Sequence, residues 1–97
     1  MDALQNCVLQ IPELGWWLEV GTDHPLCIYY FGPFTNQAEA EAAKDEHLND
    51  IRHEHADIVY AKCKFCQPRK LTIYEYELTM HDLELCPPTF FEALVMR

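Results

Sequence analysis

The stretch from Trp16 to Phe34, WWLEVGTDHPLCIYYFGPF, constrains the fold more than any other part of the chain. Its first five residues have the period of a β-strand, with Trp17 and Glu19 on the face opposite to the other three. Residues 21–25 carry a glycine first and a proline last, a composition typical of a turn. Residues 26–31 are apolar on both faces, which indicates a central strand covered on both sides. The stretch therefore predicts two antiparallel strands joined by a short turn.

A helix is predicted to follow, from about residue 36 to residue 54. Asn36 and Glu39 have the spacing of a capping box at its start. Its apolar stripe comprises Ala40, Ala43, His47, Leu48, Ile51 and His55. The opposite face carries acidic residues four positions apart, which repel one another. Such a helix is held by packing against the sheet, and its outer face is an acidic surface.

Two further strands complete the predicted sheet. Residues 59–65 alternate between apolar and polar positions, as in a half-buried antiparallel strand, and residues 71–76 follow after a turn at Gln67-Pro68. The order ββαββ predicts an α+β fold with a four-stranded antiparallel sheet and one main helix packed on one face. Short amphipathic helices are predicted at both termini, in the segments 1–13 and 79–97 that flank a core domain of residues 14–78.

The two terminal helices rest on local patterns. Leu4, Cys7, Val8 and Ile11 have helical spacing, and the proline after them ends the pattern. Near the other end, residues 89–96 begin with a Thr89/Glu92 capping box. The first of these segments is too short to be helical alone in water, so it is expected to pack on the domain or on a partner.

If alternate residues of each predicted strand point to opposite faces of the sheet, the face opposite the helix carries aromatic side chains with lysines among them. An uncovered aromatic face with basic neighbours is typical of a binding surface. We therefore predict a partner-binding site there, made of Trp17, Tyr60, Lys62, Lys64, Tyr74 and Tyr76. The tail of residues 79–97 either covers this face or docks elsewhere, and the sequence leaves both arrangements open.

The charge distribution limits the classes of partner. The formal net charge is −9 at pH 7, which repels nucleic acid and anionic lipid. Lys62, Lys64, Arg69 and Lys70 fall within nine residues without an acid among them, so a basic edge on an acidic body is expected. An aromatic face with lysines would suit single-stranded RNA, but the net charge argues against that hypothesis. No apolar run approaches the ~20 residues of a membrane-spanning helix, and no secretory signal is visible, so a cytoplasmic protein is expected.

The cysteines supply an alternative function. Five cysteines without an export signal favour reduced thiols over a disulfide framework. Cys63 and Cys66 could serve a thiol- or zinc-dependent regulatory protein, but their spacing on a strand sends them to opposite faces. Asp23 and His24 have no nucleophile placed beside them by the sequence, so a hydrolase has little support. We therefore predict no catalytic residues, no metal site and no cofactor.

Several uncommon tripeptides occur in order: WW with LEV, then PLCIYYFGPF, then AEAEAA, and finally CQPRKLTI. In these the chain resembles a small cyanobacterial protein family of unknown function, with a Trp-Trp strand, a Tyr-Tyr-Phe-Gly-Pro-Phe corner and a Cys-x-Pro…Leu-Thr-Ile end. The residues that fit this pattern are Trp16, Trp17, Glu19, Pro25, Cys27, Tyr30, Phe31, Gly32, Pro33, Phe34, Glu39, Ala40, Cys66, Pro68, Leu71, Thr72 and Ile73. Cys63 is not part of it, and the last 20 residues lie outside it.

The resemblance offers no catalytic residues to carry over. It implies a cyanobacterial setting, in which small acidic α+β proteins attach to light-harvesting assemblies. The order of elements also resembles, in topology alone, the capping linker domain of phycobilisome rods. We therefore expect a non-enzymatic adaptor or linker-like protein whose partner is a phycobiliprotein or a photosystem subunit. It would lie in the cytoplasm or at the cytoplasmic face of the thylakoid membrane.

Overall fold

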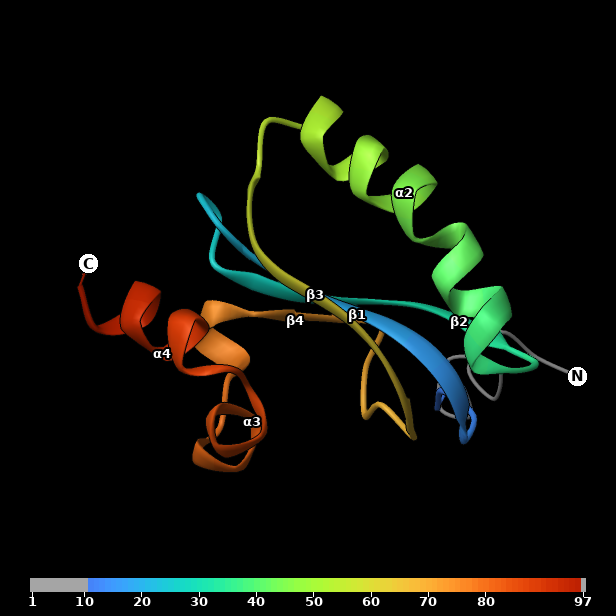
Figure 1. Ribbon diagram of the computed structural model, residues 1–97. Coiled ribbons are helices and arrows are strands. Elements are labelled where there is room, and N and C mark those ends of the chain that lie inside the picture. Colours follow the sequence, from blue (N-terminus) through green and yellow to red (C-terminus); the bar gives the residue numbers. More distant parts are fainter. Residues whose placement is uncertain (1–10, 97) are drawn as a thin grey trace, which may run out of the picture.

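The structure is a computed structural model, and it describes residues 11–96 (Figure 1). The strands are β1 Gly15–Asp23, β2 Cys27–Phe34, β3 Asp57–Cys66 and β4 Thr72–Tyr74. The helices are α2 Gln37–His53, the 3-10 helix η1 Glu75–Glu77, α3 Met80–Leu85 and α4 Pro88–Val95. The helix predicted in segment 1–13 falls almost wholly outside the described residues.

The four strands form one antiparallel sheet in the order β3-β1-β2-β4. This confirms the predicted ββαββ arrangement with its single main helix. It also confirms that β2 is a central strand, because β1 and β4 pair with it on either side. The hairpin is longer than predicted, since β1 continues to Asp23 and only residues 24–26 form the turn.

Helix α2 covers one face of the sheet, which we call the helix face (Figure 1). Leu18 and Val20 of β1 pack there against Leu48 and Ile51 of the helix, and all four side chains are buried. The helix begins as predicted at the Asn36 cap, whose side-chain oxygen accepts from the Glu39 backbone N–H at 2.8 Å. The Glu39 carboxylate accepts in turn from the backbone N–H of residue 35, at 3.1 Å, rather than from that of the cap residue itself.

The helix ends at His53, slightly earlier than predicted. His55 lies beyond this end, is exposed and has a φ of 65°. The prediction that His55 lies on the apolar stripe of the helix is therefore wrong. The remaining members of the stripe are buried or half-buried, which the packing of a 17-residue helix on a sheet requires.

The tail lies on the opposite side of the sheet, which we call the tail face (Figure 1). There Phe90 of α4 is fully buried in a cluster with Leu26, Ile28 and Ile73. The tail therefore covers this face, which settles the alternative left open by the sequence. Helix α3 was not predicted, although Thr79 and Asp82 cap it reciprocally. The predicted cap of α4 is wrong, because the helix starts one residue earlier and has no side-chain cap.

One irregularity in β3 changes the predicted parity of its first residues. The register against β1 shifts where Gly21 pairs with Tyr60 and the next residue of β1 pairs with Ile58. Such a bulge moves one residue out of the alternation. Ile58 consequently packs on the helix face, whereas Val59, predicted on that side, packs in the tail-face cluster.

Candidate functional site

The structure divides the six predicted partner-binding residues between the two faces. Trp17 is only 2% exposed, and its indole N–H donates to the Glu13 backbone oxygen at 2.9 Å. Tyr60 is half-buried on the tail face, where its ring meets the Phe90 ring edge-on with centroids 5.5 Å apart. These two aromatic residues are therefore internal packing residues in the described chain, and the prediction that they lie on an open face is wrong.

Tyr74 and Tyr76 lie elsewhere. In the ladder between β2 and β4, Tyr74 stands opposite Cys27, which places it on the helix face. Tyr76 follows in η1, and its ring stacks on that of Tyr74 with centroids 5.9 Å apart and planes 2° from parallel. The exposed fractions of the two side chains are 46% and 84%. The six residues therefore do not share one surface, and only the tyrosine pair is strongly exposed.

Glu19 occupies the centre of the tail face and is only 2% exposed. Its carboxylate accepts hydrogen bonds from the hydroxyls of Tyr30 and Tyr60, each at 2.7 Å. Lys64 donates to the same carboxylate at 3.1 Å, and the Lys62 ammonium lies 4.0 Å away. A buried charge is tolerated only when it is paired and hydrogen-bonded, and this arrangement meets both conditions. The two predicted lysines therefore neutralise a carboxylate inside the fold.

Burial and this carboxylate also govern the ionisation of nearby groups. Burial, followed by the negative charge of Glu19, raises the pKa of both Tyr30 and Tyr60. Burial likewise raises the pKa of Cys66 and Cys86, and the Cys86 sulfur lies 3.7 Å from the Tyr60 hydroxyl. Because the thiolate is the reactive form of cysteine, both thiols are held in their unreactive state.

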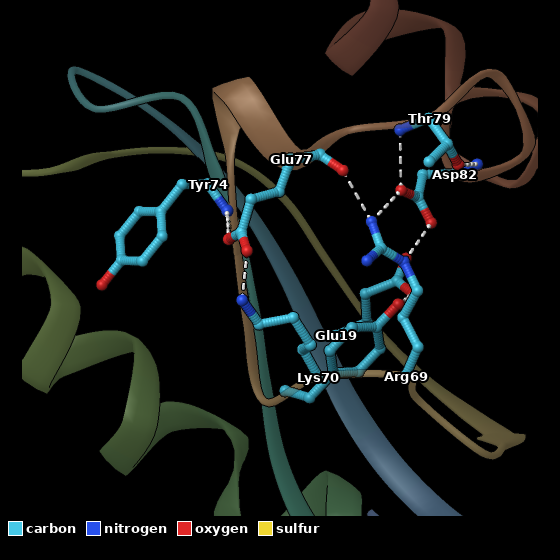
Figure 2. A network of polar contacts seen from close by, with 8 residues as sticks. Glu19, Arg69, Lys70, Tyr74, Glu77, Thr79 and Asp82 are labelled. Carbon is cyan, nitrogen blue, oxygen red and sulfur yellow. Dashed lines mark hydrogen bonds and ion pairs between the residues drawn. The ribbon is translucent and has the colours of Figure 1, made fainter. Parts of the chain in front are cut away.

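The other two residues of the predicted basic edge are also paired with acids (Figure 2). Arg69 donates to the Asp82 carboxylate at 2.7 Å and to the Glu77 backbone oxygen at 2.7 Å. Lys70 forms an ion pair with the Glu77 carboxylate. The hydrogen bond from Lys70 lowers the pKa of Glu77, whereas for Asp82 burial opposes the hydrogen bonds from Arg69 and Thr79, which prevail and lower the pKa. The basic edge thus fastens the tail to the sheet.

The helix face is left partly open. Helix α2 packs mainly on β3 and β1 and less on β2. Beyond it, a row of aromatic side chains follows β2 and β4; we call it the aromatic strip and define it as Tyr29, Phe31, Phe34, Tyr74 and Tyr76. The first three are half-buried and the last two exposed. Figure 2 shows the ring of Tyr74 pointing away from the polar network around Lys70.

Ring contacts hold the strip in place. Phe31 stacks on His47 of α2, with centroids 4.3 Å apart, and Tyr29 stacks on Phe31 at 6.4 Å. His47 is thus a packing residue, in agreement with its predicted place on the apolar stripe. Burial raises the pKa of Tyr29 to about 12, with a side-chain hydrogen bond to Cys27 and the negative charges of Cys27 and Glu54 adding to the effect. The strip is therefore a set of stacked aromatic rings with the Glu54 carboxylate nearby.

The Cys63 and Cys66 side chains lie on opposite faces of β3, as their spacing predicts. Cys63 packs at the helix face, and Cys66 lies near Tyr30 and Lys64 on the other side. Within residues 11–96, no three histidine, cysteine or acidic side chains are gathered so that they could hold a metal ion. The pair therefore does not form a half-site for zinc by itself. Among the described residues, no helix is both long and apolar enough to cross a membrane.

Sequence reasoning missed Glu19 as the centre of the tail face. The signal was available, because an acid between the apolar residues of WWLEV must find partners when both faces of that strand are covered. It also missed Tyr29, Phe31 and Phe34 as surface candidates. Which residues of the helix face stay uncovered depends on where α2 crosses the strands. The sequence pattern does not contain that information.

Comparison with known proteins gives one match. Residues 9–73 match the family described as a domain of unknown function, DUF1816. The matched region runs from before β1 through Ile73 in β4, and it leaves η1, α3 and α4 outside. No curated protein and no solved structure shows significant similarity to the chain.

Proposed function

The chain belongs to the DUF1816 family, and from this premise we propose that it is a non-enzymatic adaptor that binds another protein through its aromatic strip. Support for the proposal comes from one observation above all. Tyr74 and Tyr76 form a stacked, exposed pair that continues a row of half-buried aromatic rings. Aromatic side chains that are partly buried and partly exposed to solvent are typical of interface anchors.

The composition of the surroundings favours a basic partner surface. Glu54 lies close enough to the strip to influence the ionisation of Tyr29. The outer face of α2 adds further exposed acids, and the net charge of the chain is −9. A partner that presents lysine or arginine around an apolar patch would therefore be steered toward this side of the molecule.

The proposed partner is a component of a cyanobacterial photosynthetic complex, either a phycobiliprotein or a photosystem subunit. This part of the proposal is supported by the resemblance of the Trp-Trp strand and the Tyr-Tyr-Phe-Gly-Pro-Phe corner to a cyanobacterial family. The protein would act in the cytoplasm or at the cytoplasmic face of the thylakoid membrane. Nucleic acid is not proposed as a partner, because Lys62, Lys64, Arg69 and Lys70 all have acidic partners within the fold.

The non-enzymatic part of the proposal is supported by the state of the thiols. Cys27, Cys63, Cys66 and Cys86 all have a pKa raised by burial, which is the reverse of what a nucleophilic cysteine needs. A regulator that uses Cys63 and Cys66 as a pair is not favoured by the structure, because the two sulfurs lie on opposite faces of the sheet.

A binding assay with purified complexes tests the proposal. Cosedimentation of the chain with isolated phycobilisomes and with isolated photosystems should detect binding to one of them. The double variant Tyr74→Ser/Tyr76→Ser should weaken that binding by about tenfold or more, since interface aromatics carry a large share of binding energy.

The matched control is Phe91→Ser, because Phe91 is also an aromatic residue with 45% of its side chain exposed but lies on the tail. Its binding should equal that of the wild type. Absence of binding to either complex would contradict the proposed partner. Equal loss in both variants would contradict the role of the aromatic strip.

A further inference from the structure

The tail face contains a site for one aromatic side chain, which Phe90 fills. Leu26, Ile28 and Ile73 surround Phe90 in one buried cluster, and the Tyr60 ring meets it edge-on. We call these four residues, together with Gly21, the aromatic socket. A side-chain Cβ placed on Gly21 would lie 2.8 Å from the Phe90 ring and 2.0 Å from that of Tyr60. The Phe90 ring therefore fits in the socket because position 21 is a glycine and carries no side chain.

The socket and its occupant come from different parts of the chain. All five socket residues lie within residues 9–73, which match the family, whereas Phe90 and the rest of α4 lie outside that match. Beside the socket, Glu19 receives its hydrogen bonds from Tyr30, Tyr60 and Lys64, which all belong to the matched region. The tail adds a contact of the Cys86 sulfur with the Tyr60 hydroxyl and a hydrogen bond from Lys62 to the Leu85 backbone oxygen. The family domain therefore supplies the apolar site, and the tail supplies the side chain that fills it.

The attachment of the tail is centred on Phe90. Phe90 is the one side chain of α4 that is fully buried, and α3 has no buried residue. The ion pairs that fasten the tail use Arg69 and Lys70, whose side chains are 44% and 46% exposed. Ion pairs at the surface contribute little to stability, so the tail is held mainly by the apolar cluster around Phe90, on which Leu83, Ala93 and Leu94 also pack.

We propose that the aromatic socket is a second interaction site, which accepts a short amphipathic helix of a partner protein carrying one buried phenylalanine, and that the tail competes with this helix. The chemistry of the ligand follows from α4, whose eight residues PTFFEALV show what the socket accepts. A second copy of the chain is a poor source of this helix, because two molecules of charge −9 repel each other. The proposal is independent of the aromatic strip, which lies on the opposite face of the sheet.

The test uses the full chain and a fluorescent peptide of residues 79–96 as the probe, under reducing conditions. In the wild type the attached tail competes with the peptide. In Phe90→Ala the socket is vacated, and the peptide should bind about thirtyfold more tightly, as expected when one anchoring aromatic is released. A peptide that carries the Phe90→Ala substitution should lose this gain. The Phe91→Ala variant, altered at a side chain that is 45% exposed, is the control and should behave as the wild type.

Equal affinity of the peptide for wild type and Phe90→Ala would overturn the proposal, and so would binding that does not depend on the phenylalanine of the peptide. Sedimentation of the wild type should show a monomer, whereas a dimer formed by exchanged tails would overturn the assignment to a different partner. If Phe90→Ala does not fold, amide hydrogen exchange of the wild type decides. Faster exchange in α3 and α4 than in β1 and β2 supports a tail that opens, and equal protection overturns it.

Discussion

The two faces of the sheet differ in what they bury and in what they leave exposed. The tail face buries the Glu19 carboxylate, which accepts hydrogen bonds from Tyr30, Tyr60 and Lys64 beneath the tail. The helix face carries no such charge in its core, and a single helix leaves the aromatic strip beside it partly uncovered. The comparison teaches that lysines among aromatic rings do not by themselves mark a binding surface. Lysines that are already paired with a buried acid are not available to bind a partner.

The largest expected effect is on the tail face. Glu19→Ala removes the carboxylate that two tyrosine hydroxyls and Lys64 share, and leaves these groups without their partner. We expect a loss of about 3–5 kcal/mol in the free energy of unfolding, because breaking a buried pair leaves uncompensated polar groups. Urea denaturation at pH 7 measures it.

Glu19→Gln sharpens the same comparison, because the amide oxygen still accepts a hydrogen bond but carries no charge. Its loss of stability should lie between zero and that of Glu19→Ala. If Glu19→Ala costs less than about 1 kcal/mol, the account of the tail face is wrong, since surface substitutions fall in that range.

A somewhat smaller effect is expected at the anchor of the tail. Phe90→Ala should lower the free energy of unfolding by about 3 kcal/mol, because it removes a fully buried ring from a packed cluster. Phe91→Ala, at the neighbouring exposed position, should change it by at most about 0.5 kcal/mol. The pair is compared by thermal and urea unfolding. Similar losses in the two variants would contradict the burial of one ring and the exposure of the other.

The pH dependence of stability should show an intermediate effect. In the unfolded chain cysteines ionise near pH ~8.5 and tyrosines near pH ~10. In the folded chain burial raises the pKa of Tyr29 to about 12, and it also raises the pKa of Tyr30 and Tyr60. The folded state then binds more protons than the unfolded state, so stability is fully present below these unfolded values and falls as the pH rises.

Urea denaturation at pH 7, 9, 10 and 11 should therefore show decreasing stability, with the steepest decrease above pH 10. Tyr60→Phe should make the decrease shallower, because one of the raised groups is gone. A stability that stays constant from pH 7 to pH 11 would contradict the burial of these hydroxyls and thiols.

The smallest effect on stability is expected at the exposed end of the aromatic strip. Tyr74→Ser/Tyr76→Ser should change the free energy of unfolding by no more than about 1 kcal/mol, because both side chains are exposed. The same variant should lose binding to the partner complex, as described above. Loss of stability as large as that of Phe90→Ala would show that these rings belong to the core and not to an interface.

Much of the fold could be predicted from the sequence because its signals are local. Alternation in β1 correctly placed Leu18 and Trp17 on opposite faces, and the apolar residues 26–31 correctly indicated a central strand. The Asn36 cap located the start of α2. Each of these features depends on residues a few positions apart, which is the range over which periodicity and capping act.

The site could be predicted only in part, because it depends on register and on contacts distant in sequence. Tyr74 was assigned to the wrong face because alternation within β4 does not show which residue of β2 it pairs with, and the structure pairs it with Cys27. Val59 was misplaced by a bulge that the pattern does not show. The partners of the basic residues, Glu19 on one side and Asp82 on the other, are 45 and 13 positions from Lys64 and Arg69.

Hydroxyl-radical footprinting of the free protein, read by mass spectrometry, tests most directly the central claim that one face is sealed and the other open. The account predicts that, of the aromatic residues on the two faces, Tyr76 and Tyr74 are oxidised fastest, while Trp17, Tyr60 and Phe90 are oxidised much more slowly. Oxidation of Trp17 and Tyr60 as fast as that of the tyrosine pair would contradict it.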